Sequence, residues 1–271
     1  MQWLLHLYRW LIARKAGYRL NLHLYKLSLR GIGVLNSEGS WATGETAFFE
    51  WLKDNQLSPQ VIIDAGANTG HISLELLEIF PTAQIWAFEP HPKTFEQLKK
   101  NVQSHKNIHA IQAGLGDKTQ TTTLWDFAKS APLKSTQPTS TLSSLHKPII
   151  TQHYGQPAQG YQVNITTLDK VAQQHQLTQI DLLKIDTEGH ELSVLKGANQ
   201  LLKNGKIKVI QFEFNELHAY SKVFMKDFVE LLNDFDFYRL LPDGPVALGP
   251  YRPITHEIFG FQNIVAIKRN K

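Results

Sequence analysis

Val61-Ile-Ile-Asp-Ala-Gly-Ala-Asn-Thr-Gly-His71 is the stretch of this chain that decides the fold. Its first three residues are apolar, which predicts a short buried strand, and Asp64 closes that strand. The turn that follows is built from small residues, namely Gly66, Asn68 and Gly70. Residues 72–79 are apolar with helical periodicity, so a helix is expected next. A strand that runs through such a turn into a helix brings backbone amides close to a nucleoside-like ligand.

The spacing of the turn distinguishes between nucleoside classes. The pattern here is D-x-G-x-N-x-G, whereas a dinucleotide fingerprint is G-x-G-x-x-G and a phosphate-binding loop needs G-K-[ST]. Asparagine tolerates the left-handed backbone almost as glycine does, so we expect Asn68 to occupy a glycine-like turn position. An acid before the turn and no nearby lysine suit a ligand with an amine or a sulfonium. This is the pattern of S-adenosylmethionine binding in class I methyltransferases; the alternative is an ordinary corner whose glycines serve packing.

Two further acids follow later strands in the expected order. Glu89 ends the apolar run 84–88 and lies 25 residues after Asp64, close to the spacing of a ribose-binding carboxylate. Asp117 follows the third predicted strand, 107–112, where an acid can accept a hydrogen bond from an adenine amino group. Alone, Asp117 would be interpreted as a turn residue. The ordered series of three acids favours an adenosine-containing ligand.

Composition sets broad limits on the class of protein. The chain has 271 residues, of which 42% are hydrophobic, enough for one α/β domain with additions. It contains no cysteine, which excludes disulfides, thiolate metal sites and cysteine nucleophiles. No apolar stretch reaches about 18 residues, so no membrane-spanning helix is predicted. A cytoplasmic location is the default expectation, with peripheral attachment to the inner face of a membrane as an addition to it.

The positive charge of the chain belongs to its amino-terminal segment. Residues 1–30 carry six Lys and Arg and no acid, whereas the remainder carries 22 Lys and Arg against 24 Asp and Glu. A general nucleic-acid-binding surface is therefore not expected. Residues 1–12 predict an amphipathic helix with one narrow polar face, formed by Gln2, His6 and Arg9. We favour packing of this helix on the domain or on a partner; contact of residues 1–15 with a membrane surface is the alternative.

The rest of the chain predicts an α/β organisation. Residues 18–29 alternate apolar and polar side chains, which predicts an extended segment, so that residues 1–40 form an amino-terminal helix and extension. Strands and helices then alternate through residues 41–271, which predicts one domain with a mainly parallel sheet and helices on both faces. Residues 237–241 and 263–268 predict a terminal antiparallel pair. A polar segment at 127–160 is interpreted as an insertion loop, with a lid as the alternative.

Acids gather after two later strands. The run Asp181-Leu-Leu-Lys-Ile-Asp-Thr-Glu-Gly-His-Glu191 brings Asp186 to the carboxyl end of a strand, with Glu188 directly after it. Glu213 ends the next strand at the same edge of the sheet, so Asp186 and Glu213 are expected to be neighbours. Clustered acids require a positive partner, which a sulfonium or a divalent metal can provide. The alternative interpretation is that these acids interact favourably with the positive end of a helix dipole, and it suits Glu191 best.

These motifs together resemble those of the FkbM-type family of S-adenosylmethionine-dependent methyltransferases. The resemblance rests on residues 43–45 with Phe48 and Phe49, on 64–70, 88–90 and 116–117 and, most specifically, on 184–197. It extends over about residues 40–268. It implies a Rossmann-like class I methyltransferase fold with a seven-stranded sheet. It also implies O-methylation of a sugar or glycan hydroxyl, or of a natural product. The first 35 residues and the segment 127–160 lie outside the resemblance, and we expect them to choose the acceptor.

The expected mechanism assigns Asp186, Glu188 and Glu213 to catalysis. The cofactor-binding assignment comprises Asp64, Gly66, Asn68, Gly70, Glu89 and Asp117. Asp186 is the expected base, and the sequence leaves open whether neighbouring acids strengthen it or whether a Mg²⁺ or Mn²⁺ ion acidifies the hydroxyl. Two other functions remain as alternatives: a catalytically silent module of the same fold that binds a glycan or a partner, and an NAD-type oxidoreductase, which the turn spacing opposes.

Overall fold

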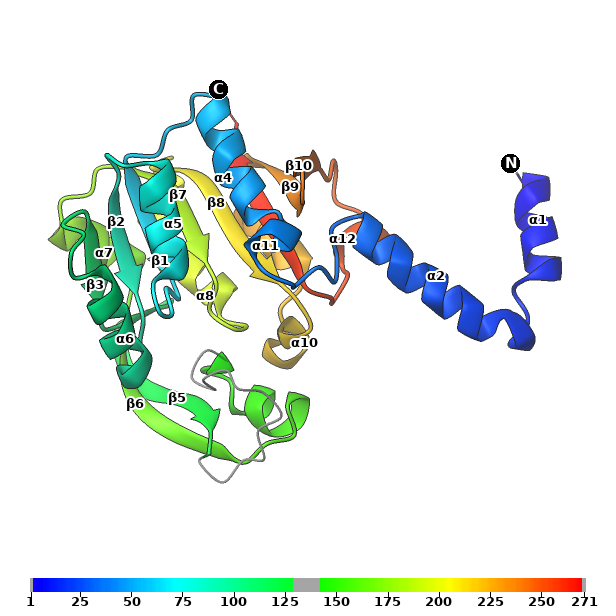
Figure 1. Ribbon diagram of the computed structural model, residues 1–271, viewed down its shortest axis with the longest axis horizontal. Helices are drawn as coiled ribbons and strands as arrows, with labels where there is room; N and C mark the ends of the chain where they lie inside the picture. Colours follow the sequence, from blue (N-terminus) through cyan, green and yellow to red (C-terminus); the bar gives the residue numbers. More distant parts are fainter. Residues whose placement is uncertain (1, 129–141, 270–271) are drawn as a thin grey trace.

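A central sheet with helices on both faces forms the body of the computed structural model, which describes residues 2–128 and 142–269 (Figure 1). The sheet has eight strands in the order β10-β9-β11-β8-β7-β1-β2-β3. The strands span Val61–Ala65 (β1), Gln84–Phe88 (β2), Ile108–Ile111 (β3), Ile180–Ile185 (β7), Ile207–Phe214 (β8), Phe235–Leu241 (β9), Gly244–Ala247 (β10) and Gln262–Lys268 (β11). The predicted mainly parallel α/β fold is therefore confirmed.

The strand directions divide the sheet into a parallel part and an antiparallel part. The five strands β3, β2, β1, β7 and β8 are parallel, and β11 lies antiparallel to both β8 and β9. The eighth strand is the difference from the seven expected. It arises because β9 and β10 are joined by only two residues, Pro242 and Asp243, which turn the chain back into a hairpin.

Helices cover both faces of the sheet because its strands are apolar on both sides. One face is covered by α4 (Glu45–Asp54), α5 (His71–Ile79) and α6 (Pro92–Val102), and the other by α7 (Leu168–Gln174), α8 (Glu191–Lys196), α9 (Asn199–Lys203) and α11 (Met225–Leu231). Three short helices lie in connections: α3 (Ser40–Thr43), α10 (Leu217–Ser221) and α12 (Pro253–His256).

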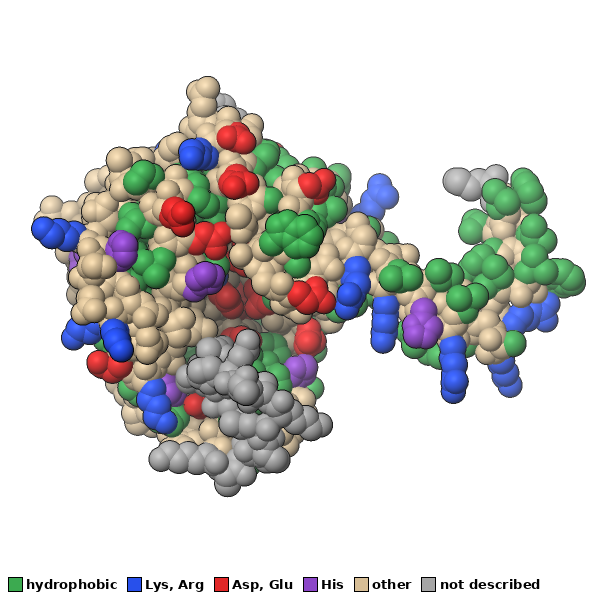
Figure 2. Space-filling model, viewed as in Figure 1, with side chains coloured by type: hydrophobic (Ala, Val, Ile, Leu, Met, Phe, Trp, Pro, Cys, Tyr) green, Lys and Arg blue, Asp and Glu red, His purple; other side chains and the backbone are tan. Residues whose placement is uncertain are grey.

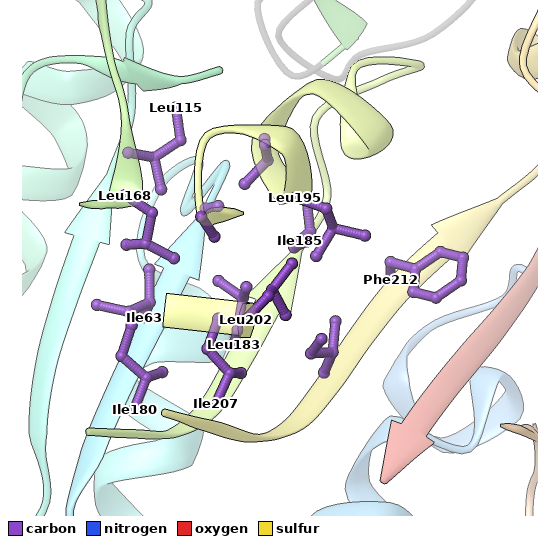
Figure 3. Close-up of a cluster of buried hydrophobic side chains, with 14 of the residues drawn as sticks. Ile63, Leu115, Leu168, Ile180, Leu183, Ile185, Leu195, Leu202, Ile207 and Phe212 are labelled. Atoms are coloured by element: carbon purple, nitrogen blue, oxygen red, sulfur yellow. The ribbon is translucent and has the colours of Figure 1, made fainter. Parts of the chain in front are cut away.

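Successive strand residues contribute to two separate cores. Ile62 and its neighbour Leu182 are buried under α4 to α6, whereas the next pair, Ile63 and Leu183, is buried under α7 to α11. Figure 3 shows the second cluster, in which Ile63, Leu183 and Phe212 project from the strands toward residues of the covering helices. Burying apolar side chains on both faces fixes the register, since a shift by one residue would exchange the two sets.

A second, smaller sheet lies beyond the carboxyl ends of the parallel strands. It has the order β4-β6-β5 and contains Gly114–Leu115 (β4), Gln120–Phe127 (β5) and Ala158–Thr166 (β6). Residues 129–141 of the predicted polar loop lie outside the described residues. The described part contains a π-helix, Ile149–His153, and Ser144 pairs with Trp125 of β5 through two backbone hydrogen bonds of 2.8 and 2.9 Å. This part therefore packs against the small sheet.

The amino-terminal segment extends away from the body as two helices (Figure 1). They are α1 (Gln2–Leu11) and α2 (Tyr18–Gly31), joined by a turn of 3₁₀ helix at Lys15–Gly17. The prediction of an extended segment at 18–29 is wrong. Leucines at 20, 22 and 24 fit a period of two, but the segment pairs with no strand in the described structure, and its Leu, Arg and Lys residues favour helix. Among the described residues, no helix is long and apolar enough to cross a membrane.

The substitution Gly66→Ala tests how closely β1 and β7 approach each other. Gly66 has φ +85°, and a Cβ there would lie 1.8 Å from the carbonyl oxygen of Asp186. Left-handed strain and overlap with rigid backbone together should lower the free energy of unfolding by about 3 kcal/mol or more. Urea denaturation followed by circular dichroism measures this loss.

Gly155→Ala is the matched control, because Gly155 also has positive φ, at +63°, but no heavy atom lies within 4 Å of the position that its new methyl group would take. Only the backbone cost of about 1–2 kcal/mol is expected there. Equal losses for the two substitutions would contradict the close approach of the two strands.

Candidate active site

A cavity of about 210 Å³ opens at the carboxyl ends of β1, β2 and β7. β1 lies between β2 and β7, so the chain order reverses there, and ligands bind in the crevice at such a switch point. The cavity is lined by Gly66, Asn68, Glu89, Pro90, Gly114, Leu115, Leu124, Ser143, Leu145, Ile165, Asp186, Thr187, Glu188 and His190. Figure 2 shows acidic side chains in a hollow of this face.

The turn after β1 forms one wall of the cavity. Asn68 has φ +50°, which confirms the expectation that it takes a glycine-like position. Backbone amides of Gly66 and Ala67 donate to the carbonyl oxygen of Phe88 at 3.0 and 2.8 Å, so the turn is tied to the end of β2. The Oδ1 atom of Asn68 is buried and has no hydrogen-bond partner. Gly70 lies away from the cavity, where it allows α5 to pack on Leu98.

Glu89 lies at the end of β2 with both carboxyl oxygens held in place. Its Oε2 accepts from the backbone amide of Asn68 at 3.1 Å and its Oε1 from that of His91 at 2.7 Å. Each oxygen keeps a lone pair for a ligand. Burial, only partly offset by these hydrogen bonds, raises the pKa of Glu89 to about 7. The predicted ribose-binding carboxylate is thus in the cavity wall.

Besides Gly70, two of the predicted cofactor residues do not line the cavity. Asp64 is fully buried beneath the turn, where it accepts from the hydroxyl of Ser73 at 2.5 Å, and burial raises the pKa of its carboxyl. Asp117 is exposed, and the corresponding wall is formed by Gly114 and Leu115 instead. The assignment of Asp117 to adenine stays a prediction, and the cavity geometry gives it no support.

A buried lysine joins the acids at this edge of the sheet, and the sequence analysis missed it. The Nζ atom of Lys184 lies 3.3 Å from Asp186 Oδ2 and 3.9 Å from Glu45 Oε1. Although burial disfavours its charge, these carboxylates raise the pKa of Lys184 above its usual range. Burial in turn raises the pKa of Glu45. A lysine inside the otherwise apolar strand 182–185 was the available signal.

The three predicted catalytic acids lie close together but differ in environment. The register pairs Ile185 with Phe212, so Asp186 and Glu213 follow on neighbouring strands as expected. Asp186 and Glu188 line the cavity, whereas Glu213 is 9% exposed and lies outside the set of lining residues. Burial, followed by the charge of Asp186, raises the pKa of both Glu188 and Glu213 well above the usual range.

Glu191 has a structural task in the loop after β7. Its Oε1 accepts from the backbone amides of Thr187 and Gly189 at 2.8 and 3.3 Å, and its Oε2 lies 3.0 Å from His218 Nε2. Burial opposes its ionisation, but the hydrogen bond and charge of His218 prevail and lower the pKa of Glu191 to about 2. Glu191 therefore holds the loop that presents Asp186 and Glu188.

The upper wall of the cavity comes from residues that sequence patterns did not identify. Leu124 of β5, Ile165 of β6 and Leu145 contribute apolar surface, and the Ser144 hydroxyl donates to the carbonyl oxygen of Glu188 at 2.7 Å. His190 also lines the cavity, and burial lowers its pKa to about 4. These contacts exist because the small sheet lies over the edge of the central sheet, and no local sequence pattern predicts that arrangement.

A divalent metal does not fit the described residues. In the ranges 2–128 and 142–269, no three His, Asp or Glu side chains are arranged to hold one ion. The Lys184 ammonium lies among the acids where a cation would otherwise bind.

The family model of the methyltransferase FkbM domain matches residues 64–239 of this chain. The resemblance seen in the sequence is thereby confirmed. The matched range contains the turn after β1, Glu89 and the loop that carries Asp186 and Glu188. It ends before β11 and begins after α4, so Glu45 lies outside it.

Three curated proteins illustrate the similarity. Methyltransferase 1 of Beauveria bassiana is 32% identical over 143 residues, which are 50% of this chain and 57% of that protein. Methyltransferase sdnD of Sordaria araneosa is 31% identical over 164 residues, 54% of this chain and 63% of that protein. The 2-O-methyltransferase NoeI of Sinorhizobium fredii is 23% identical over 188 residues, 68% of this chain and 75% of that protein. The chain thus spans less than two thirds of the first two relatives.

Lys184→Met tests the buried charge cluster at nearly constant side-chain length. Removing the ammonium leaves Glu45, Asp64 and Asp186 without their cation, which should cost about 3–5 kcal/mol of unfolding free energy at pH 8. The loss should be smaller at pH 5, because Glu45 and Asp64, whose pKa values burial raises, can then take up protons. Urea denaturation at both pH values measures it.

Lys99→Met is the control, since Lys99 is an exposed residue of α6, and a change within about 0.5 kcal/mol is expected. An equal loss at pH 5 and pH 8 for Lys184→Met would show that packing, not charge, is what the lysine contributes.

Proposed function

We propose, on the premise that this chain belongs to the methyltransferase FkbM domain family, that it transfers a methyl group from S-adenosylmethionine to a hydroxyl oxygen. One observation carries the proposal. The cavity has a turn and a carboxylate suited to a nucleoside on one wall, formed by Gly66, Asn68 and Glu89, and acids suited to proton transfer on the other, formed by Asp186 and Glu188.

The described residues fit the adenosyl group of this donor. Glu89 keeps two lone pairs that can accept from the two ribose hydroxyls, and its oxygens are already fixed by backbone amides. The buried Oδ1 of Asn68 has no protein partner and is free to accept from a ligand. Gly66 lines the cavity with backbone atoms only, since it has no side chain. The surrounding acids favour a ligand that carries positive charge.

Asp186 is the residue that we assign to proton removal. When bound, S-adenosylmethionine supplies a methyl group already activated by its sulfonium, so the chain has mainly to position the acceptor and to take its proton. Lys184 Nζ lies 3.3 Å from Asp186 Oδ2, so one oxygen of this carboxyl group contacts the ammonium. The other oxygen of Asp186 remains available to an acceptor hydroxyl. Burial raises the pKa of Glu188 and Glu213 well above the usual range, which favours their protonated forms near this carboxyl group.

The acceptor that we propose is a sugar hydroxyl of a glycan or a hydroxyl of a natural product. NoeI, one of the similar proteins, is a 2-O-methyltransferase. The wall formed by Leu124, Leu145 and Ile165 is apolar, while Ser143 and His190 add polar groups, which suits the mixed surface of a sugar or a polyketide. Because this wall comes from the small sheet and its connection, we assign acceptor choice to it.

Asp186→Asn tests the assignment of the base. The substitution keeps shape but removes the charge, so turnover should fall roughly 10²–10⁴-fold. The measurement is intact-mass analysis of methylated product after incubation with S-adenosylmethionine and a panel of glycans and hydroxylated natural products. Calorimetric binding of S-adenosylmethionine should persist, since the ribose contacts lie at β2.

Activity of the unchanged protein should survive EDTA. Loss of activity that Mg²⁺ or Mn²⁺ restores would contradict direct proton removal by Asp186. Full turnover by Asp186→Asn would refute the assignment. Tight binding of NAD with no binding of S-adenosylmethionine would refute the proposed function itself.

Glu89→Gln tests the ribose contact through its pH dependence. A ribose hydroxyl donates to the charged carboxylate, so a group with a pKa of about 7 must lose its proton on binding below that pH. Affinity for S-adenosylmethionine should therefore rise about tenfold from pH 6 to pH 8 in the unchanged protein. Isothermal titration calorimetry across this range measures the trend.

Glu89→Gln should bind more weakly at pH 8 and show a flatter pH profile, because glutamine does not titrate. The melting temperature of this variant should also depend less on pH between about 4.5 and 7. The raised pKa of Glu89 makes the unchanged fold lose stability as pH rises from about 4.5 to 7. Parallel pH profiles for the two proteins would remove Glu89 from the ribose site.

A further inference from the structure

We infer that the amino-terminal arm, defined here as residues 2–31, docks this protein on an anionic membrane surface. The inference does not depend on the proposed function. Its first support is exposure: within the described structure none of the ten residues of α1 is buried, and Leu29 is the only buried residue of α2. Figure 1 shows both helices projecting from the body. The expected packing of α1 on the domain does not occur in this structure.

The exposed surface of α1 is mostly apolar and aromatic. Trp3 and Trp10 are 66% and 65% exposed. The other large apolar residues exposed on this helix are Leu4, Leu5, Leu7, Tyr8 and Leu11. At 100° per residue they leave only the narrow polar face of Gln2, His6 and Arg9. An apolar surface of this extent marks a binding site, and tryptophan is the side chain that suits the boundary between acyl chains and headgroups.

Positive charge is concentrated along α2. Arg19, His23, Lys26 and Arg30 recur at spacings of three and four residues, which brings them into one stripe. In Figure 2 the basic side chains of the arm project along one side of it. Leu20, Leu24 and Leu27 are exposed beside this stripe. A long basic stripe flanked by leucines can contact acidic headgroups while its apolar neighbours reach the acyl boundary.

The charge of the arm also favours a membrane over a second copy of this chain as its binding partner. Residues 1–30 contain six Lys and Arg and no acid, so two arms packed on each other would bring like charges together without compensation. An anionic bilayer instead complements every one of these cations. Each Lys or Arg near such a surface contributes to binding, and the effect falls with salt.

The base of the arm holds it in a fixed direction relative to the catalytic domain. The amide of Leu35 donates to the carbonyl oxygen of Phe261 at 2.7 Å, and Arg239 donates to the carbonyl oxygen of Ile32 at 3.5 Å. Val34 is fully buried. The arm therefore connects a membrane-bound helix to the body through an anchored junction, and the domain would be held beside the bilayer.

Vesicle co-sedimentation of the full chain tests the inference. Vesicles of phosphatidylcholine mixed with phosphatidylglycerol should bind the protein about tenfold or more better than vesicles of phosphatidylcholine alone, and added salt should weaken the binding. The double variants Trp3→Ala/Trp10→Ala and Arg19→Glu/Lys26→Glu should each lower binding by about tenfold or more. Their melting temperatures should match that of the unchanged protein, because these side chains are exposed.

Two substitutions on the body serve as matched controls. Trp41→Ala removes an exposed tryptophan of α3, and Lys99→Glu reverses an exposed lysine of α6, so both should leave vesicle binding unchanged. Equal binding to neutral and anionic vesicles, or equal binding by the arm variants, would overturn the inference. A dimer that forms without vesicles and is lost in Trp3→Ala/Trp10→Ala, with no vesicle binding, would assign the arm to a second copy instead.

Discussion

The close approach of β1 and β7 at their carboxyl ends is the constraint on which the site depends. The amide of Asp186 donates to the carbonyl oxygen of Ala65 at 2.9 Å, and the carbonyl oxygen of Asp186 lies where a side chain on Gly66 would be. This contact joins the turn that forms the nucleoside wall to the loop that carries the acids. The two walls of the cavity are therefore fixed relative to each other by backbone contacts, which suits the proposed reaction because it depends on positioning.

The second feature is an excess of buried acid around one buried cation. Lys184 lies within 4 Å of Glu45 and Asp186, while Glu188 and Glu213 have raised pKa values. Such a cluster costs stability in the free protein, because each carboxylate has lost water that one ammonium only partly replaces. The charges of this cluster therefore affect the stability of the fold at the site itself.

The arm and the small sheet are additions at two ends of the same domain. The small sheet covers the cavity through contacts such as that of the Ser144 hydroxyl with the carbonyl oxygen of Glu188. The arm leaves the body at a junction anchored by Val34 and Leu35. The arm lies outside the range 64–239 that the family model matches, whereas the small sheet lies inside it.

The sequence by itself determined those parts of the protein that depend on interactions between residues close together in the chain. Apolar runs bounded by turns predicted the central strands, and D-x-G-x-N-x-G predicted the left-handed turn at Asn68, because few side chains tolerate that backbone. Glu89 and Asp186 were found because each directly follows a buried strand.

Tertiary structure alone decided the rest. Glu45 reaches Lys184 from a helix far away in the chain, the upper wall depends on the small sheet, and Asp117 is exposed and outside the cavity lining. The segment 18–29 became a helix because alternating leucines form a strand only where a neighbour supplies hydrogen bonds, and the arm has none among the described residues.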